Sequence, residues 1–355
     1  MPASGPRHDY DLNLRVGELV EVLSEEEILR TLDAKGRLDA LPFMPEMLQY
    51  CGKRFRVYKR ADKTCDTIDN AGSRRMRGAV HLEDLRCDGA AHGGCQARCL
   101  IFWKEAWLRR VQTGFLRELA GKTRKLSRPV SLPTSPGNGS ITIDTLIQAT
   151  RAASPVSHRE EEVYSCQATE HLKATSPMVW WDVSQYMRDM WTGNVSIPEV
   201  LRAISFWVFT KMLKVGGYRA LIGTYNRMQE MRGGCPYPFR AGKLTKTPSA
   251  ELNLQPGELV QVKSHDEVLE TLDQRNRNRG LSFDVEMVRY CGGKYRVIQR
   301  VERIIHEKTG KMIRLPGVCV MLEGVTCRAE YSRHRLFCPR TIHSFWREIW
   351  LRRAE

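Results

Sequence analysis

The sequence lacks long hydrophobic runs and an export signal. Its longest apolar run lies around Ile204 to Val208, far below the roughly 20 residues that cross a bilayer. The opening residues, MPASGPRHDYDLNLR, hold neither an apolar core nor a cleavage pattern. We therefore expect a cytoplasmic protein without membrane association.

Common catalytic signatures are also missing. The sequence has no phosphate loop, no dinucleotide-binding glycine motif and no nucleophile elbow. Glu170 and His171 are adjacent, but a carboxylate and an imidazole without geometry are weak signs of acid and base catalysis. The sequence alone does not decide whether the chain is an enzyme.

Acidic residues are outnumbered by basic ones. The 355 residues include 56 Lys and Arg against 41 Asp and Glu, a formal net charge of +15. Such an excess attracts acidic partners when it gathers on one face. Here the basic residues are dispersed and no nucleic-acid-binding motif accompanies them, so a nucleic-acid partner and a solvated basic surface explain the charge equally well. A hydrophobic content of 42% predicts ordinary globular cores.

Cysteine, in contrast, is plentiful. Eleven cysteines without an export signal favour thiols and metal ligands over a disulfide framework. The stretch CDGAAHGGCQARCLIFWKEAW begins at Cys87, and its later part predicts an amphipathic helix that begins near Cys95. Cys95 and Cys99 lie four residues apart, and Trp103 and Trp107 continue the same helical face.

These thiols predict a metal site. Cysteine and histidine are the usual ligands of tetrahedral zinc, and an iron–sulfur cluster is the alternative cofactor. A set of buried, inert thiols is the competing interpretation. The candidate ligands in the first part of the chain are Cys65, Cys87, His92, Cys95 and Cys99.

An internal repeat relates the two ends of the chain. Residues 17–60 align with 257–300 without a gap, and 22 of the 44 aligned positions are identical. FWKEAWLRR at Phe102 also recurs as FWREIWLRR at Phe345, so each repeat is expected to end in the same helix. Identical pairs include Phe43/Phe283, Glu46/Glu286, Met47/Met287 and Cys51/Cys291.

The second repeat is poorer in thiols. Its Cys327 and Cys338 align with Cys87 and Cys95, whereas isoleucines stand opposite Cys65 and Cys99. We expect a degraded or mixed Cys/His site that holds metal more weakly, because protons compete for imidazole. Its candidate ligands are His306, Cys327, His334, Cys338 and His343.

Local patterns predict an α+β fold with two small SH3-like barrels. The alternating strand Gly17 to Val22 precedes a capping box at Ser24, and further strands are expected at Phe55 to Arg60 and near Arg77 to Leu82. The predicted segments are a barrel module with a Cys-rich metal site at 12–112, a partly disordered linker at 113–162, a helical module at 163–234, a proline-rich connector at 235–254 and a second barrel module at 255–355.

The middle of the chain predicts helices. Ser196 and Pro198 introduce a helix over Ile197 to Val215, and Val163 to Lys173 reads as another. Met178 to Asn194 is rich in tryptophan. We interpret it as core packing with its charges outward, rather than as a cleft holding perturbed carboxylates.

The stretches LPFMPEMLQYCGKRFRVYKRA and LRCDGAAHGGCQARCLIFWKEAWL resemble an uncharacterised bacterial family with duplicated modules. That resemblance implies a bacterial cytoplasmic origin and carries over no catalytic residue. We expect a zinc-stabilised binding or scaffolding protein with a protein partner. A metalloenzyme or redox protein with a Cys-ligated centre is the alternative, and a purely structural role in a larger complex is a third possibility.

Overall fold

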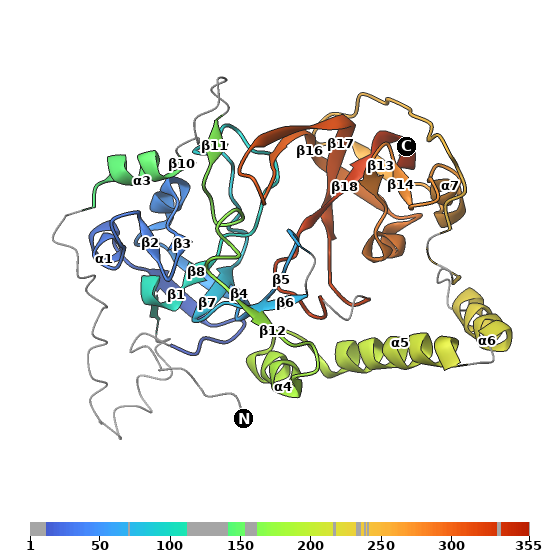
Figure 1. The fold of residues 1–355 in the computed structure, drawn as a ribbon, viewed down its shortest axis with the longest axis horizontal. Coiled ribbons are helices and arrows are strands. Elements are labelled where there is room, and N and C mark those ends of the chain that lie inside the picture. Colours follow the sequence, from blue (N-terminus) through green and yellow to red (C-terminus); the bar gives the residue numbers. More distant parts are fainter. Residues whose placement is uncertain are drawn as a thin grey trace. The chain divides into compact units, whose positions relative to one another are not determined.

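The computed structural model describes residues 12–69, 72–111, 141–152, 162–215, 218–231, 236–237, 239, 241–331 and 335–354. Contacts divide the chain into two compact units, which are mixed α and β with several small antiparallel sheets (Figure 1). The predicted linker lies largely outside the described residues. Unit 1 comprises Met1–Val195, Ile305–Met312 and Cys338–Arg340, and unit 2 comprises Ser196–Ile304, Ile313–Phe337 and Thr341–Glu355.

Unit 1 is built on a five-stranded sheet with the order β8-β7-β4-β1-β9. The alternation predicted from Gly17 gives β1, in which Val20 and Val22 are buried and Leu19 and Glu21 are partly exposed. The capping box at Ser24 is confirmed and begins helix α1, Glu25–Leu29. The strands are β1 Leu19–Val22, β4 Arg54–Arg60, β7 Ala79–Leu82, β8 Trp103–Lys104 and β9 Leu108–Arg110.

Unit 2 contains a sheet with the corresponding order, β18-β17-β16-β13-β19. Its register matches as well, since Val20 faces Phe55 in unit 1 and Val260 faces Tyr295 in unit 2. In the described residues β8 and β9 are edge strands, as are β18 and β19, so closed barrels stay a prediction. The strands are β13 Leu259–Val262, β16 Lys294–Ile305, β17 Met312–Thr326, β18 His343–Arg347 and β19 Leu351–Arg353.

The predicted terminal helix is wrong in both repeats. The segment from Trp103 forms strand β8, the 3-10 turn η2 (Glu105–Trp107) and strand β9. The second repeat has the same arrangement, with η4 at Glu348–Trp350. Residues 100–108 are all buried, so the segment lacks the exposed polar face of an amphipathic helix and forms two short strands joined by a turn instead.

Each sheet packs on a tryptophan that hydrogen-bonds to a threonine. Trp107 is fully buried, and its Nε1 donates to Thr31 Oγ1 at 3.1 Å. Phe43 meets the Trp107 ring edge-on, with a centroid distance of 5.2 Å. In unit 2 Trp350 Nε1 donates to Thr271 Oγ1 at 2.9 Å, so the polar ends of the Trp107 and Trp350 indoles are satisfied.

The middle of the chain differs in part from the prediction. The helix expected over Val163 to Lys173 is wrong, because the segment forms the short strand β11 followed by turns. The helix over Ile197–Val215 (α5) is confirmed. None of the described helices is long and apolar enough to span a bilayer.

The remaining elements complete the two units. They are β2 Arg37–Leu38, β3 Leu41–Pro42, η1 Pro45–Tyr50, β5 Lys63–Cys65, β6 Ser73–Arg75, α3 Ile143–Ala149, β10 Arg151–Ala152, β11 Val163–Tyr164, β12 Ser176–Met178, α4 Val183–Thr192, α6 Tyr218–Met231, α7 His265–Leu269, β14 Arg277–Asn278, β15 Leu281–Ser282 and η3 Val285–Tyr290.

Candidate metal centre

The 3-10 helix η1 places a carboxylate inside unit 1. Pro45 stands at the start of this helix, where its missing N–H costs nothing. Met47 packs in the core, and the neighbouring Glu46 turns into a buried site where its side chain is only 3% exposed. A carboxylate at this depth requires a cation or several hydrogen-bond donors.

The cysteine loop after β7 closes over this carboxylate. Cys87 N–H donates to the Cys99 carbonyl at 2.9 Å, and an isolated bridge joins Arg86 to Leu100. Gly89 has a φ of +75°, and a Cβ there would lie 2.0 Å from the Cys95 carbonyl oxygen. The tight turn therefore requires glycine at this position.

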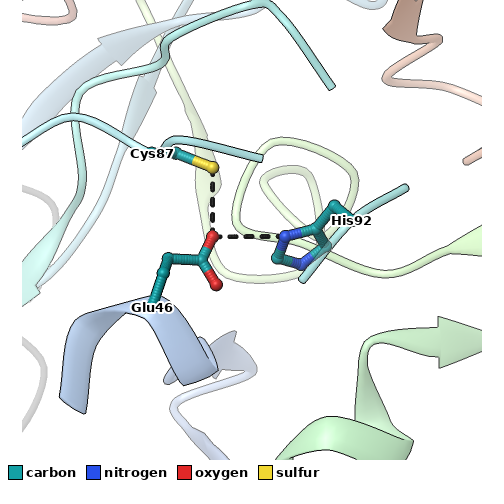
Figure 2. A group of neighbouring side chains, drawn as sticks. All are labelled: Glu46, Cys87 and His92. Atoms are coloured by element: carbon teal, nitrogen blue, oxygen red, sulfur yellow. Dashed lines mark hydrogen bonds and ion pairs between the residues drawn. The ribbon is translucent and has the colours of Figure 1, made fainter. Parts of the chain in front are cut away.

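Glu46, Cys87 and His92 converge in this loop (Figure 2). Cys87 Sγ donates to Glu46 Oε1 at 3.0 Å, and His92 Nδ1 lies 3.2 Å from the same oxygen. One ligand atom from each residue lies within 4.8 Å of the other two. Two ligands of a tetrahedral zinc ion are about 3.5 Å apart, so this spacing suits a shared ion.

The contact made by His92 Nε2 shows which ring nitrogen carries the hydrogen. Nε2 lies 3.2 Å from the Ser165 carbonyl oxygen, which can only accept a hydrogen bond, so Nε2 carries the hydrogen. In the neutral ring Nδ1 then presents a lone pair to Glu46 Oε1. Two acceptors face each other stably only with a proton or a metal ion between them, and a backbone carbonyl behind the ring is typical of a metal-binding histidine.

Two atoms of the cluster support the metal interpretation. His92 Nδ1 and Glu46 Oε2 are both buried without a hydrogen-bond partner. The His92 side chain is 1% exposed, so water does not satisfy it from outside. Buried polar atoms without partners are costly, and a metal ion bound by Nδ1 and the carboxylate would remove that cost.

The charges of the site favour a cation. Burial raises the pKa of the Cys87 thiol, and the neighbouring Glu46 carboxylate raises it further. Burial also acts to raise the pKa of Glu46, but the adjacent His92 ring and the hydrogen bond from Cys87 outweigh it and hold this pKa below its usual value. Without metal the thiol keeps its proton and donates to an ionised carboxylate, and a bound ion would displace that proton.

A small cavity adjoins the cluster. It has a volume of about 40 Å³ and is lined by Cys87 and His92 together with three further thiols. Burial raises the pKa of Cys99 to about 12 and that of Cys166 to about 11. The third thiol, Cys95, accepts a hydrogen bond from Ile305 N–H at 3.4 Å. A cavity of this size holds an ion or a few waters rather than an organic substrate.

The structure thus brings together part of the predicted ligand set. Cys87 and His92 meet, with Cys95 and Cys99 on the same cavity. Cys65 lies beside Cys338 instead, where its N–H donates to Cys338 Sγ at 3.1 Å. Among the described residues, Glu46, Cys87 and His92 form the single group of three or more ligands within 4.8 Å.

The second repeat has a different arrangement around the counterpart of Glu46. Glu286 is 1% exposed and accepts a hydrogen bond from Tyr331 N–H at 2.8 Å. Burial raises the pKa of Glu286. The predicted ligands of the second repeat do not form one group in the described residues. Cys327 and His343 belong to unit 2, whereas His306 and Cys338 belong to unit 1, where His306 Nδ1 lies 3.0 Å from Thr309 Oγ1. His334 lies outside the described residues.

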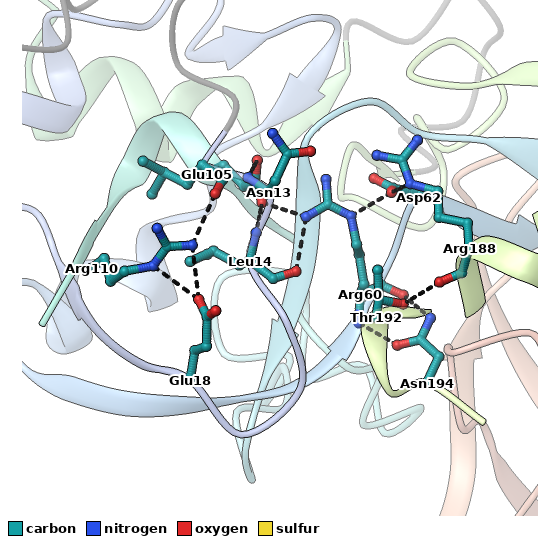
Figure 3. A network of polar contacts seen from close by, with 11 residues as sticks. Asn13, Leu14, Glu18, Arg60, Asp62, Glu105, Arg110, Arg188, Thr192 and Asn194 are labelled. Atoms are coloured by element: carbon teal, nitrogen blue, oxygen red, sulfur yellow. Dashed lines mark hydrogen bonds and ion pairs between the residues drawn. The ribbon is translucent and has the colours of Figure 1, made fainter. Parts of the chain in front are cut away.

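A second buried polar cluster in unit 1 is fully hydrogen-bonded (Figure 3). Glu105 accepts from Leu14 N–H at 2.8 Å, from Asn13 N–H at 3.1 Å and from Arg60 Nη1 at 2.6 Å. In unit 2 Glu348 accepts equivalent bonds from Leu254 N–H and Arg300 Nη1, both at 3.0 Å. Because every oxygen has a donor, this cluster is a structural clamp rather than a ligand site.

Sequence reasoning missed Glu46 and Cys166. The signal for Glu46 was present, since Glu46 and Glu286 are identical in the repeat and each lies between apolar residues. No comparable signal marks Cys166, which comes from a segment 67 positions beyond Cys99 (166 − 99). Comparisons with protein-family models, curated proteins and solved structures gave no match to this chain.

Proposed function

We propose that the chain is a metal-stabilised binding protein in which Glu46, Cys87 and His92 hold a zinc ion that stabilises unit 1. One observation carries this proposal. His92 Nδ1 is buried, lacks a hydrogen-bond partner and faces Glu46 Oε1 at 3.2 Å, while Nε2 is committed to the Ser165 carbonyl. If Nδ1 binds a metal ion and Nε2 donates to the Ser165 carbonyl, both ring nitrogens of His92 have a partner.

The donor set favours zinc over other common ions. A thiolate and an imidazole are poor ligands for magnesium and calcium, which take oxygen atoms. Zinc accepts sulfur, nitrogen and carboxylate oxygen together in tetrahedral sites. An iron–sulfur cluster, the alternative cofactor, requires several thiolates around eight atoms, and the adjoining cavity of about 40 Å³ offers little room for it.

The site suits a structural ion better than a catalytic one. Three protein ligands would leave a fourth position, which is the arrangement of catalytic zinc. A catalytic ion, however, needs a substrate beside it, and the cavity here has space for a few waters at most. Stabilisation of the Cys87–Cys99 loop is therefore the function that this geometry supports best.

The two repeats would present binding surfaces as tandem SH3-like modules. The matching strand orders and registers of the two five-stranded sheets support this part of the proposal. A protein is the proposed partner. Because the net charge is +15, an acidic polymer such as RNA is the alternative partner that a binding test must distinguish from it. Binding to RNA that weakens steeply with salt would favour the acidic polymer.

Metal content distinguishes the two repeats. Glu46→Gln removes a charged ligand with little change in shape, whereas Glu286→Gln changes the aligned residue of the second repeat. We expect one zinc per chain in the wild type and in Glu286→Gln, and at least tenfold weaker zinc binding in Glu46→Gln. Competition with a fluorescent chelator and elemental analysis measure both quantities. Equal zinc affinity in the two variants would contradict the proposal.

A further inference from the structure

Two buried cysteines lie side by side in unit 1 outside the Glu46–Cys87–His92 group. Cys65 ends strand β5 and Cys338 comes from a segment near the end of the chain, and they are 4% and 6% exposed. Cys65 N–H donates to Cys338 Sγ at 3.1 Å. The Cys65 side chain also faces Cys338 and, as a hydrogen-bond donor, lowers the pKa of that thiol.

Arg340 places a fixed positive charge next to this pair. Its Nη1 donates to the Cys65 carbonyl at 3.4 Å and to Thr67 Oγ1 at 2.8 Å. Its Nη2 lies 3.1 Å from Glu307 Oε1, which anchors the guanidinium from the other side. Arg340 is 4% exposed, so little solvent screens its charge from the two sulfurs.

These donors make Cys338 different from its neighbours. Burial acts to raise its pKa, but the hydrogen bonds from Cys65 and the charge of Arg340 outweigh it and hold the pKa below its usual value. Burial instead raises the pKa of Cys99 and Cys166, which belong to the same unit. The Cys65 thiol therefore faces a sulfur that is held toward its thiolate form, and a thiolate beside a thiol is the arrangement that oxidises to a disulfide.

We propose that Cys65 and Cys338 form a peroxide-sensitive pair that hydrogen peroxide converts to a disulfide. The Cys338 thiolate attacks one oxygen of the peroxide, so an S–O bond forms, the O–O bond breaks and hydroxide leaves. Cys65 then attacks the sulfenic acid of Cys338; the S–S bond forms, and the S–O oxygen leaves as water with the Cys65 proton. The two sulfurs lose two electrons and the peroxide gains them.

Because both sulfurs are buried, the size of an oxidant decides whether it reaches them. Hydrogen peroxide is only slightly larger than water and enters a protein through small fluctuations, whereas a peptide disulfide such as oxidised glutathione requires exposed sulfur. With 4% and 6% exposure, the pair should react with the peroxide and resist glutathione disulfide. This proposal does not depend on the metal at the Glu46–Cys87–His92 group.

Mass spectrometry of the full chain tests the proposal. The protein is treated with hydrogen peroxide, its remaining thiols are alkylated, and tryptic peptides are analysed without reductant. We expect residues 64–74 linked to residues 336–340 before any other cysteine pair, and at least tenfold slower linkage with equimolar glutathione disulfide. A first disulfide between other cysteines, or none, would overturn the proposal.

Two variants separate the roles of the sulfurs. Cys65→Ser should leave Cys338 as a sulfenic acid that dimedone traps, whereas Cys338→Ser should slow peroxide oxidation of Cys65 at least tenfold. Cys319→Ser is the matched control, since it removes a buried thiol of unit 2 and should leave the linkage unchanged. Chelator treatment beforehand should not change the rate. A faster reaction after chelation would mean that a metal holds these two thiols, and would contradict the proposal.

Discussion

Cys87→Ser is expected to lower the unfolding temperature of unit 1 by about 5–11 °C in a buffer with free zinc at about 100 times the dissociation constant. Binding at that ratio stabilises the folded state by about 2.7 kcal/mol. One kcal/mol corresponds to about 2–4 °C for a domain of this size. Serine can still donate to Glu46 Oε1, as Cys87 does at 3.0 Å, so the loss reflects the metal rather than the hydrogen bond.

Calorimetry with and without a strong chelator measures this effect. The chelator should reproduce the shift in the wild type and add little to it in Cys87→Ser. Cys327→Ser, at the aligned position of the second repeat, is the matched control and should leave the metal-dependent shift in place. A wild-type transition that is insensitive to chelator would contradict a stabilising ion.

Glu105→Ala should lower the free energy of unfolding of unit 1 by about 3–5 kcal/mol, because it breaks a buried ion pair from one side. The Glu105 side chain is fully buried and Arg60 is 3% exposed, so the guanidinium would stay in the core with Asp62 as its remaining carboxylate. Two backbone N–H groups, of Asn13 and Leu14, would also lose their acceptor. Urea denaturation measures the loss.

Two further substitutions calibrate that result. Glu18→Ala removes a partly exposed carboxylate that pairs with Arg110 at 3.0 Å, and it should cost at most about 1 kcal/mol. Glu348→Ala should destabilise unit 2 as strongly as Glu105→Ala destabilises unit 1, since Glu348 is 2% exposed and holds Arg300. A loss below about 1 kcal/mol in Glu105→Ala would show that the clamp is dispensable.

Short-range signals predicted the local elements well. The capping box at Ser24 and the helix that begins at Ile197 depend on residues a few positions apart, and both are confirmed. The FWKEAWLRR segment failed because buried tryptophans four apart fit a helix face and a strand–turn–strand equally well. Pairing of Trp103 with Val80 in β7 decides the outcome, and that partner is distant in sequence.

In the segment Met178 to Asn194, too, a partner distant in sequence determines which charged residue is buried. We expected its charged residues outward, yet Asp189 is 4% exposed and pairs with Lys63, while Trp191 is 60% exposed. An aspartate is buried only when a cation reaches it, and this cation comes from β5. The helical period alone carries no information about such a partner.

The candidate metal centre was half predictable for the same reason. Cys87 and His92 lie in one loop, so their spacing pointed to a common site. Glu46 reaches them from η1, and the carbonyl that orients His92 belongs to Ser165. Cys65 was assigned to the loop by residue type, but the fold places it against Cys338, which is 273 positions away.

X-ray absorption at the zinc edge tests the ligand set most directly. For the zinc-loaded chain we expect a first shell with one sulfur at about 2.3 Å and nitrogen and oxygen atoms at about 2.0–2.2 Å. Cys87 is the expected source of the sulfur, and the sulfur signal should vanish in Cys87→Ser loaded with excess zinc. A shell of two or more sulfurs would contradict the Glu46–Cys87–His92 assignment and restore the thiol-rich site that the cysteine spacing first suggested.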